Sequence, residues 1–166
     1  MSDALEFLTR GVLIGMGASA LMDVWALVVR RAFGIQGLDY ALLGRWIGHF
    51  GRGRFFHKRI ASAAPVRGER LLGWLAHYAI GVVFAFLLLL MWGVEWARSP
   101  TLWPPLVVGL GTIVAPWFVL QPGMGAGIAA SKTPNPRATR LRNLATHAVY
   151  GIGLYGSTVA LASFWS

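Results

Sequence analysis

The sequence contains no cysteine. This absence excludes disulfide bonds, thiolate metal sites and catalysis by a cysteine nucleophile together. Charged residues are also scarce, at 13% of the chain, whereas they make up about a quarter of an average soluble domain. Hydrophobic residues reach 56%, and the mean hydropathy is +0.59. This composition indicates a membrane protein.

Four apolar runs are long enough to cross a bilayer, for which about 20 residues suffice. They are residues 12–29, 71–92, 102–120 and 144–165. The segments between them are too short and too rich in Gly and Pro to form a separate soluble domain. We therefore predict an all-α, polytopic membrane protein with four transmembrane helices in a single domain over residues 1–166. The helices are expected in two similar hairpins, at about 8–95 and about 100–165.

Acidic residues are few, with six Asp and Glu against fifteen Lys and Arg, and the formal net charge is +9. Nine basic residues lie between Arg30 and Arg70 and four between Lys132 and Arg142, which leaves only Arg10 and Arg98 elsewhere. Successive spans alternate sides, so both basic loops would share one face. An excess of Lys and Arg marks the cytoplasmic face. We expect both loops in the cytoplasm and both termini outside, and we expect no nucleic-acid binding.

The first basic loop contains two distinct segments. Asp39 can cap a short helix whose apolar face suits the headgroup layer. A segment of basic and aromatic residues follows, and its side chains are predicted to contact anionic lipid or phosphate. The candidates for this contact are Arg52, Arg54, Lys58 and Arg59.

The second basic loop opens with a glycine-rich stretch over residues 121–127. A phosphate-binding P-loop ending at Lys132 would need glycine where the chain has Ala126 and Ser131. The stretch also follows an apolar helix rather than a strand, so we interpret it as a flexible turn.

Small residues recur every four positions along the apolar runs, which is typical of helix–helix contacts in lipid. The first run ends such a series on a carboxylate, and the second and fourth contain a histidine in theirs. A kink is expected at Pro116. The predicted series are Gly11, Gly15, Ser19 and Asp23; His77, Gly81 and Ala85; Gly111 and Ala115; and His147, Gly151 and Tyr155.

The two histidines occupy matched positions in what we interpret as an internal duplication. Arg67, Arg70, Leu71, His77 and Gly81 recur seventy residues later as Arg137, Arg140, Leu141, His147 and Gly151.

Asp23, His77 and His147 each lie seven residues from a basic residue, or roughly 10 Å from the cytoplasmic interface at 1.5 Å per residue. We therefore predict one buried cluster. It could be a structural hydrogen-bond network, a site for a ligand, ion or proton, or a metal or haem site. We expect no cofactor, and the sequence does not define a metal. The candidate ligand- or ion-binding residues are Asp23, His77, His147, Tyr150 and Gln121.

Several blocks of the chain resemble the bacterial domain-of-unknown-function 2938 family. They are residues 15–23, 40–49, 65–70, 73–78 and 121–127, and together they span most of the sequence. The resemblance implies a small bacterial polytopic membrane protein and supplies no activity and no catalytic residue. The inner membrane, with both termini periplasmic, is the location we then expect.

The sequence therefore predicts a non-enzymatic membrane protein that binds or passes a small ligand, ion or proton. One alternative is a membrane-embedded metal- or haem-dependent enzyme or electron carrier. Another is a structural subunit of a larger membrane complex. The expected partners are the lipid bilayer and a second copy of the chain or another membrane protein.

Overall fold

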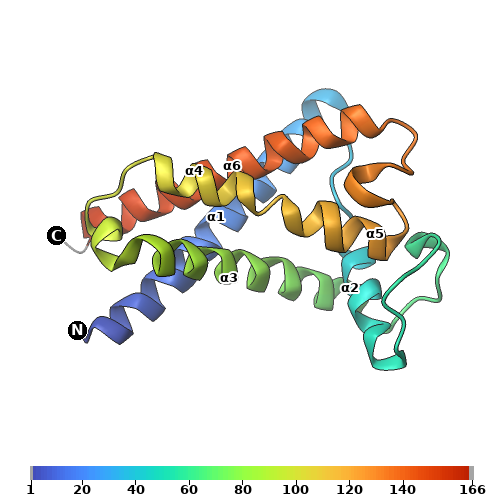
Figure 1. The fold of residues 1–166 in the computed structure, drawn as a ribbon, viewed down its shortest axis with the longest axis horizontal. Coiled ribbons are helices and arrows are strands. Elements are labelled where there is room, and N and C mark those ends of the chain that lie inside the picture. The colour runs from blue at the N-terminus through green and yellow to red at the C-terminus, as the bar shows by residue number, and fades with distance from the viewer. Residues whose placement is uncertain (1, 165–166) are drawn as a thin grey trace. The chain divides into compact units, whose positions relative to one another are not determined.

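The computed structural model describes residues 2–164, and this part of the chain contains helices and no strand. Figure 1 shows the elements in chain order. The main helices are α1 (Asp3–Phe33), α2 (Tyr40–Gly48), α3 (Glu69–Arg98), α4 (Trp103–Gly111), α5 (Gln121–Met124) and α6 (Pro136–Phe164). The shorter turns are η1 (Phe50–Arg52), η2 (Ile60–Ser62), η3 (Pro116–Leu120) and η4 (Ile128–Ala130).

Within residues 2–164, three segments are long and apolar enough to cross a membrane, not four. They are Asp3–Phe33, Glu69–Arg98 and Trp103–Met124. The sequence predicted a fourth apolar span at residues 144–165. The helix at this position, α6, has 29 residues but is less apolar than the other three segments. Its first turns contain three arginines, and its later turns contain His147 and many Gly, Ser and Thr residues. These residues lower the hydropathy of the whole helix.

The third span is not one regular helix. It begins as α4, turns at residues 112–113, and continues as the π-helical turn η3, which begins at Pro116. Proline removes a backbone donor and disturbs the preceding turn, and the sequence therefore predicted a kink at Pro116. The structure has a turn just before this residue and π-helical geometry from it onward.

The chain divides into two compact units that alternate along the sequence. Unit 1 contains residues 1–36, 78–112 and 145–166, and unit 2 contains residues 37–77 and 113–144. Unit 1 thus holds α1, α4 and most of α3 and α6, whereas unit 2 holds the two basic loops, the first turns of α3 and α6, and the second half of the third span with η3 and α5. This division does not follow the two expected hairpins.

In unit 1, small residues bring α1 and α3 into close contact, as predicted. A Cβ atom added at Gly15 would lie 2.5 Å from the Cα of Val82, and one added at Gly11 would overlap the ring of Phe86. Gly81 packs against the hydroxyl of Ser19. Glycine is required at these positions because a larger side chain would push the two helices apart.

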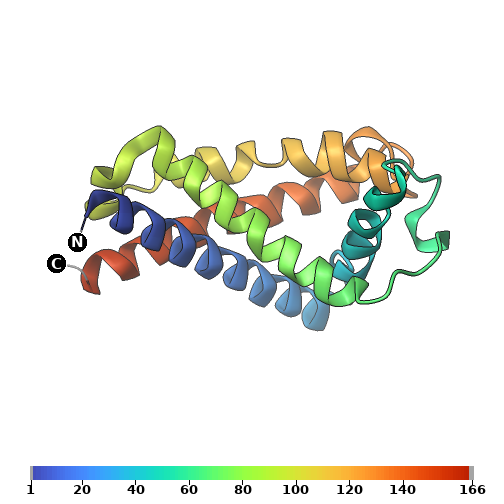
Figure 2. The ribbon, with the colours of Figure 1, turned by 90° about the horizontal axis from the view of Figure 1, so that it is seen from below.

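Helix α6 packs against more than one partner in unit 1. Gly151 lies against the backbone of α4 at Gly109 and Pro105, and Gly153 lies against Ala18 of α1. Figures 1 and 2 both show α4 beside α6. Nothing lies within 4 Å of a Cβ atom added at Gly111, so the prediction that Gly111 forms this contact is wrong. Gly111 is the last residue of α4, beyond the point of closest approach.

A bidentate ion pair anchors α2 to the start of α3 in unit 2. Arg45 donates from Nε and Nη2 to the carboxylate of Glu69 at 2.9 and 2.7 Å, and from Nη1 to the carbonyls of Ala61 and Ala63. The hydrogen bonds to Glu69 raise the pKa of Arg45 above its ordinary value. The expected cap is also present, since Asp39 accepts from the amide of Ala41 at 2.9 Å.

Candidate functional site

Asp23 lies within the long apolar helix α1, and Tyr78 of α3 holds its carboxylate. The hydroxyl of Tyr78 donates to Oδ2 of Asp23 at 3.0 Å. Both residues belong to unit 1 and are partly buried. A tyrosine hydroxyl is uncharged, so this hydrogen bond stabilises the carboxylate without neutralising it. Ionisable groups inside membrane helices are costly, and they commonly mark pathways for ions or protons.

His147 of α6 is held in one orientation by α4. Its Nδ1 lies 2.9 Å from the hydroxyl of Thr112 and 3.2 Å from the carbonyl of Gly109. The Thr112 hydroxyl itself donates to Gly109 at 2.6 Å. Both oxygens can therefore accept, and this network assigns the proton of the neutral ring to Nδ1. The lone pair on Nε2 is then the position at which His147 can take up a proton or a cation.

His77 belongs to unit 2, and its surroundings differ from those of His147. Its Nε2 lies 3.1 Å from the hydroxyl of Tyr40, and the two rings stack with centroids 4.3 Å apart. Trp74 packs on the same histidine. The matched histidines of the predicted duplication thus have unlike partners. Asp23 is hydrogen-bonded to Tyr78, His77 to Tyr40 and His147 to Thr112. The three residues therefore have different side-chain partners.

The other two predicted ligand residues form contacts within the protein. The hydroxyl of Tyr150 is buried and donates to the carbonyl of Gly81 at 2.6 Å, which ties α6 to α3. Gln121 donates through Nε2 to Oδ1 of Asn143 at 2.8 Å, and Trp117 donates to the same oxygen. Residues 2–164 contain no group of three or more His, Asp or Glu residues placed to hold a metal ion.

The charges are divided unequally between the units. Unit 2 contains eleven Lys and Arg residues and two acidic residues, which gives it a formal charge of +9. Unit 1 contains four of each sign, so its formal charge is zero. The predicted lipid contacts Arg52, Arg54, Lys58 and Arg59 are all exposed in unit 2, next to the exposed rings of Phe55 and Phe56.

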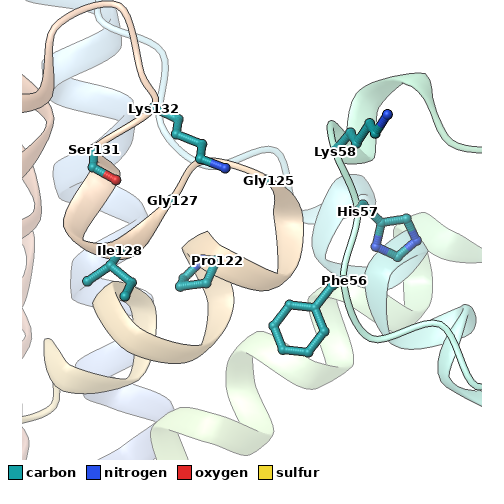
Figure 3. A pocket seen from close by; sticks show the side chains of 9 residues that line it. All are labelled: Phe56, His57, Lys58, Pro122, Gly125, Gly127, Ile128, Ser131 and Lys132. Carbon is teal, nitrogen blue, oxygen red and sulfur yellow. The ribbon is translucent and has the colours of Figure 1, made fainter.

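Unit 2 also contains a pocket of about 570 Å³ that sequence reasoning missed. Figure 3 shows its lining: the ammonium of Lys132 and the hydroxyl of Ser131 point toward the 56–58 segment, whereas the side chains of His57 and Lys58 point away. The remaining lining residues are Phe56, Pro122, Gly125, Gly127 and Ile128. The glycine-rich stretch itself was visible in the sequence. Its position beside the 56–58 segment, some seventy residues earlier, could not be predicted from either stretch alone.

A pair of histidines connects the two sides of this region. His49 is buried, and its Nε2 lies 3.0 Å from the carbonyl of Ala64 while its Nδ1 lies 2.8 Å from Nε2 of His57. His57 in turn lies against Gly123, with 2.8 Å between its amide nitrogen and the Gly123 carbonyl. The pair thereby joins the basic segment to the glycine-rich stretch.

Unit 1 contains a cluster of charged residues that was not predicted from the sequence. Glu6 and Arg10 are buried and joined at 2.8 Å, and Arg10 also donates to the carbonyl of Ala97. Arg98 donates to Glu6 at 2.6 Å and to Glu95 at 2.6 Å. The two basic residues outside the two basic loops and their borders, Arg10 and Arg98, are therefore both neutralised by acidic partners.

The comparisons with known proteins give a family and no relative of known activity. The chain matches none of the curated proteins and none of the solved structures. The model of the family described as "Protein of unknown function (DUF2938)" matches residues 12–161, which is nearly the whole sequence. The chain therefore belongs to the DUF2938 family.

Proposed function

We propose that this protein is a multi-pass membrane protein that binds and releases a proton or a small cation at Asp23. The observation that carries the proposal is the Asp23 carboxylate within a membrane-length helix, held by the Tyr78 hydroxyl at 3.0 Å. A carboxylate has two oxygens and several acceptor positions, and it can take up a proton or a cation while one oxygen accepts a hydrogen bond. The group can therefore bind a proton or a cation while it keeps its contact with Tyr78.

The other charges of unit 1 support this role. Its three remaining acidic residues, Asp3, Glu6 and Glu95, lie with Arg98 at the far end of the unit. Asp23 stands apart from that group, ten residues before the end of α1. His147, with Nδ1 held by Thr112 and Gly109, supplies a second group of the same unit that can accept a proton.

The proposal includes four crossings, with α6 as the least apolar one. Figures 1 and 2 show that α1 begins and α6 ends at the same end of unit 1. Contacts with α1 and α4 cover Gly151 and Gly153, and Thr158 is fully buried, so protein rather than lipid surrounds much of the small and polar surface of α6. Packing of this kind lets a helix of modest hydropathy cross a bilayer.

The orientation follows from the basic residues. Thirteen of fifteen Lys and Arg residues lie in the two loops of unit 2 or at their borders, and the positive-inside rule then assigns these loops to the cytoplasm. Both termini would be periplasmic in a bacterial inner membrane. The matched landmarks of α3 and α6 fit an internal duplication whose two histidines have different partners.

Proton flux in proteoliposomes tests the proposed function. Vesicles loaded with a pH-sensitive dye and driven by a potassium diffusion potential should take up protons, or sodium in a parallel assay, when they contain the wild-type protein. Asp23→Asn removes the charge, keeps the shape and should abolish the flux. Glu95→Gln is the matched control because its side chain is 83% exposed and lies with Arg98 at the other end of the unit. Equal fluxes for wild type and Asp23→Asn would contradict the proposal.

A further inference from the structure

We propose that the pocket of unit 2 binds the phosphate of an anionic lipid headgroup through Lys132 and Ser131. This inference is independent of the proposed function, because all residues that line the pocket belong to unit 2. A charged ammonium and a neighbouring hydroxyl are both donors that phosphate oxygens accept, and the charged donor makes the stronger hydrogen bond.

The backbone beside the pocket is built to place these two donors. The amide of Lys132 donates to the carbonyl of Ala126 at 2.9 Å, which closes the loop that contains Gly127. A Cβ atom at Gly125 would lie 2.6 Å from the carbonyl oxygen of His57, and Gly125 has a φ of +93°. Only glycine allows the loop to approach the 56–58 segment so closely.

The same loop contains strained backbone that other residues hold in place. Ala129 and Ala130 have φ values of +46° and +61°, a left-handed conformation that is uncommon for alanine. Arg140 donates to the carbonyl of Ala129 at 2.8 Å, and Thr133 donates to that of Ala130 at 2.8 Å. Strain that is held in this way commonly marks a binding or catalytic site. Here it turns the chain so that Ser131 and Lys132 line the pocket.

The position and the rim of the pocket favour a lipid over a soluble phosphate. Pro122 and Gly125 lie at the end of the membrane-length segment Trp103–Met124, close to where headgroups begin. The rim contains two apolar side chains, Phe56 at 78% and Ile128 at 58% exposed. A soluble anion needs no such surface, whereas the acyl chains of a lipid do.

The rival explanation is a diffuse attraction between the basic unit and any anionic surface. In that case each Lys or Arg contributes about equally, whichever way its side chain points. Arg67 separates the two explanations, because it is an exposed basic residue of the same unit that does not line the pocket, whereas the ammonium of Lys132 points across the pocket (Figure 3). Arg67→Gln is therefore the matched control for Lys132→Gln.

The experiment measures the apparent Kd of the purified full-length protein for phosphatidylglycerol in nonionic mixed micelles, with phosphatidylcholine as the reference lipid. Lys132→Gln should weaken phosphatidylglycerol binding roughly fivefold, which is the effect of about one basic residue at an anionic surface. Ser131→Ala should weaken it in the same direction, Lys132→Arg should retain it, and Arg67→Gln should change it less than about twofold.

Three results would overturn the proposal. Equal losses for Arg67→Gln and Lys132→Gln would show a diffuse charge effect. Equal affinities of the wild type for phosphatidylglycerol and phosphatidylcholine would show that no anion is recognised. Inorganic phosphate that displaces phosphatidylglycerol with an affinity equal to the lipid's would assign the pocket to a soluble phosphate instead.

Discussion

Single glycines determine how closely the helices of unit 1 approach one another. At Gly151 a Cβ atom would lie 2.8 Å from the carbonyl oxygen of Pro105, whereas at Gly111 it would meet open space. Without water to drive association, helices in lipid depend on this close packing of backbones. The two glycines therefore differ in importance although both lie in apolar helices.

Replacing Gly151 with leucine should lower the thermal stability of the detergent-solubilised protein. Bulk forced into a packed contact costs roughly 1–3 kcal/mol, because neighbouring side chains or backbone must move. Gly111→Leu is the control and should leave the unfolding temperature nearly unchanged. Scanning fluorimetry of both variants checks this, and equal losses at the two positions would show that the α4–α6 contact is misassigned.

Spacing along the sequence predicted many of these contacts and failed at identifiable points. The four-residue series on α1 and α3 was confirmed at Gly11, Gly15, Ser19 and Gly81, because both helices are regular through this contact and small residues stay on one face. His77, which was predicted in the same series, instead contacts Tyr40 and Trp74. The series on α4 was wrong because the helix ends at Gly111, and Gly109 makes the contact instead. The buried pair of Glu6 and Arg10 has the i, i+4 spacing of an ion pair, but nothing local indicates that Arg98 joins it.

At the scale of elements, the Arg45–Glu69 ion pair organises unit 2. Arg45 connects α2 to the first turn of α3 and to the carbonyls of the 61–63 segment. Glu69 also accepts from the amide of Val66 at 2.8 Å. A planar guanidinium can serve two carboxylate oxygens and two carbonyls at once, and an ammonium cannot.

Arg45→Lys should therefore loosen the basic loop while it keeps the charge. We expect faster tryptic cleavage at the exposed basic residues between Arg52 and Arg59, measured by mass spectrometry of the timed digest. Arg70→Lys is the control, since Arg70 is exposed and both substitutions preserve the number of tryptic sites. Unchanged cleavage in Arg45→Lys would mean that the ion pair does not hold the loop.

The sequence predicted elements better than the contacts between them. The cap at Asp39 and three apolar spans are properties of short stretches, and they were confirmed. Helix α6 was predicted as a fourth apolar span, but its hydropathy is too low because its contacts with other helices depend on small and polar residues. The contact between His57 and Gly123 joins residues 66 positions apart, and no periodicity of either stretch predicts it.

At the scale of the whole molecule, the two units differ in their formal net charge. Unit 1 is neutral and contains α1, α4 and most of α3 and α6, whereas unit 2, which includes residues 113–124 of the third span, carries the entire net charge of +9. Apolar segments without net charge are suited to a bilayer, and clustered basic residues are suited to an anionic membrane surface. Asp23 and His147, the residues of the proposed function, both lie in the neutral unit.

Four helical segments, α6 included, are proposed to cross the membrane so that Asp23 and His147 lie inside it. Single cysteines test this directly, because the chain has no cysteine of its own. Cysteines at Ser2, Ser62 and Ser163 would be treated with an impermeant maleimide in spheroplasts. We predict labelling at Ser2 and Ser163 in intact spheroplasts, and labelling at Ser62 only after lysis. If Ser163 instead reacts only after lysis, together with Ser62, then α6 does not cross and the account is contradicted.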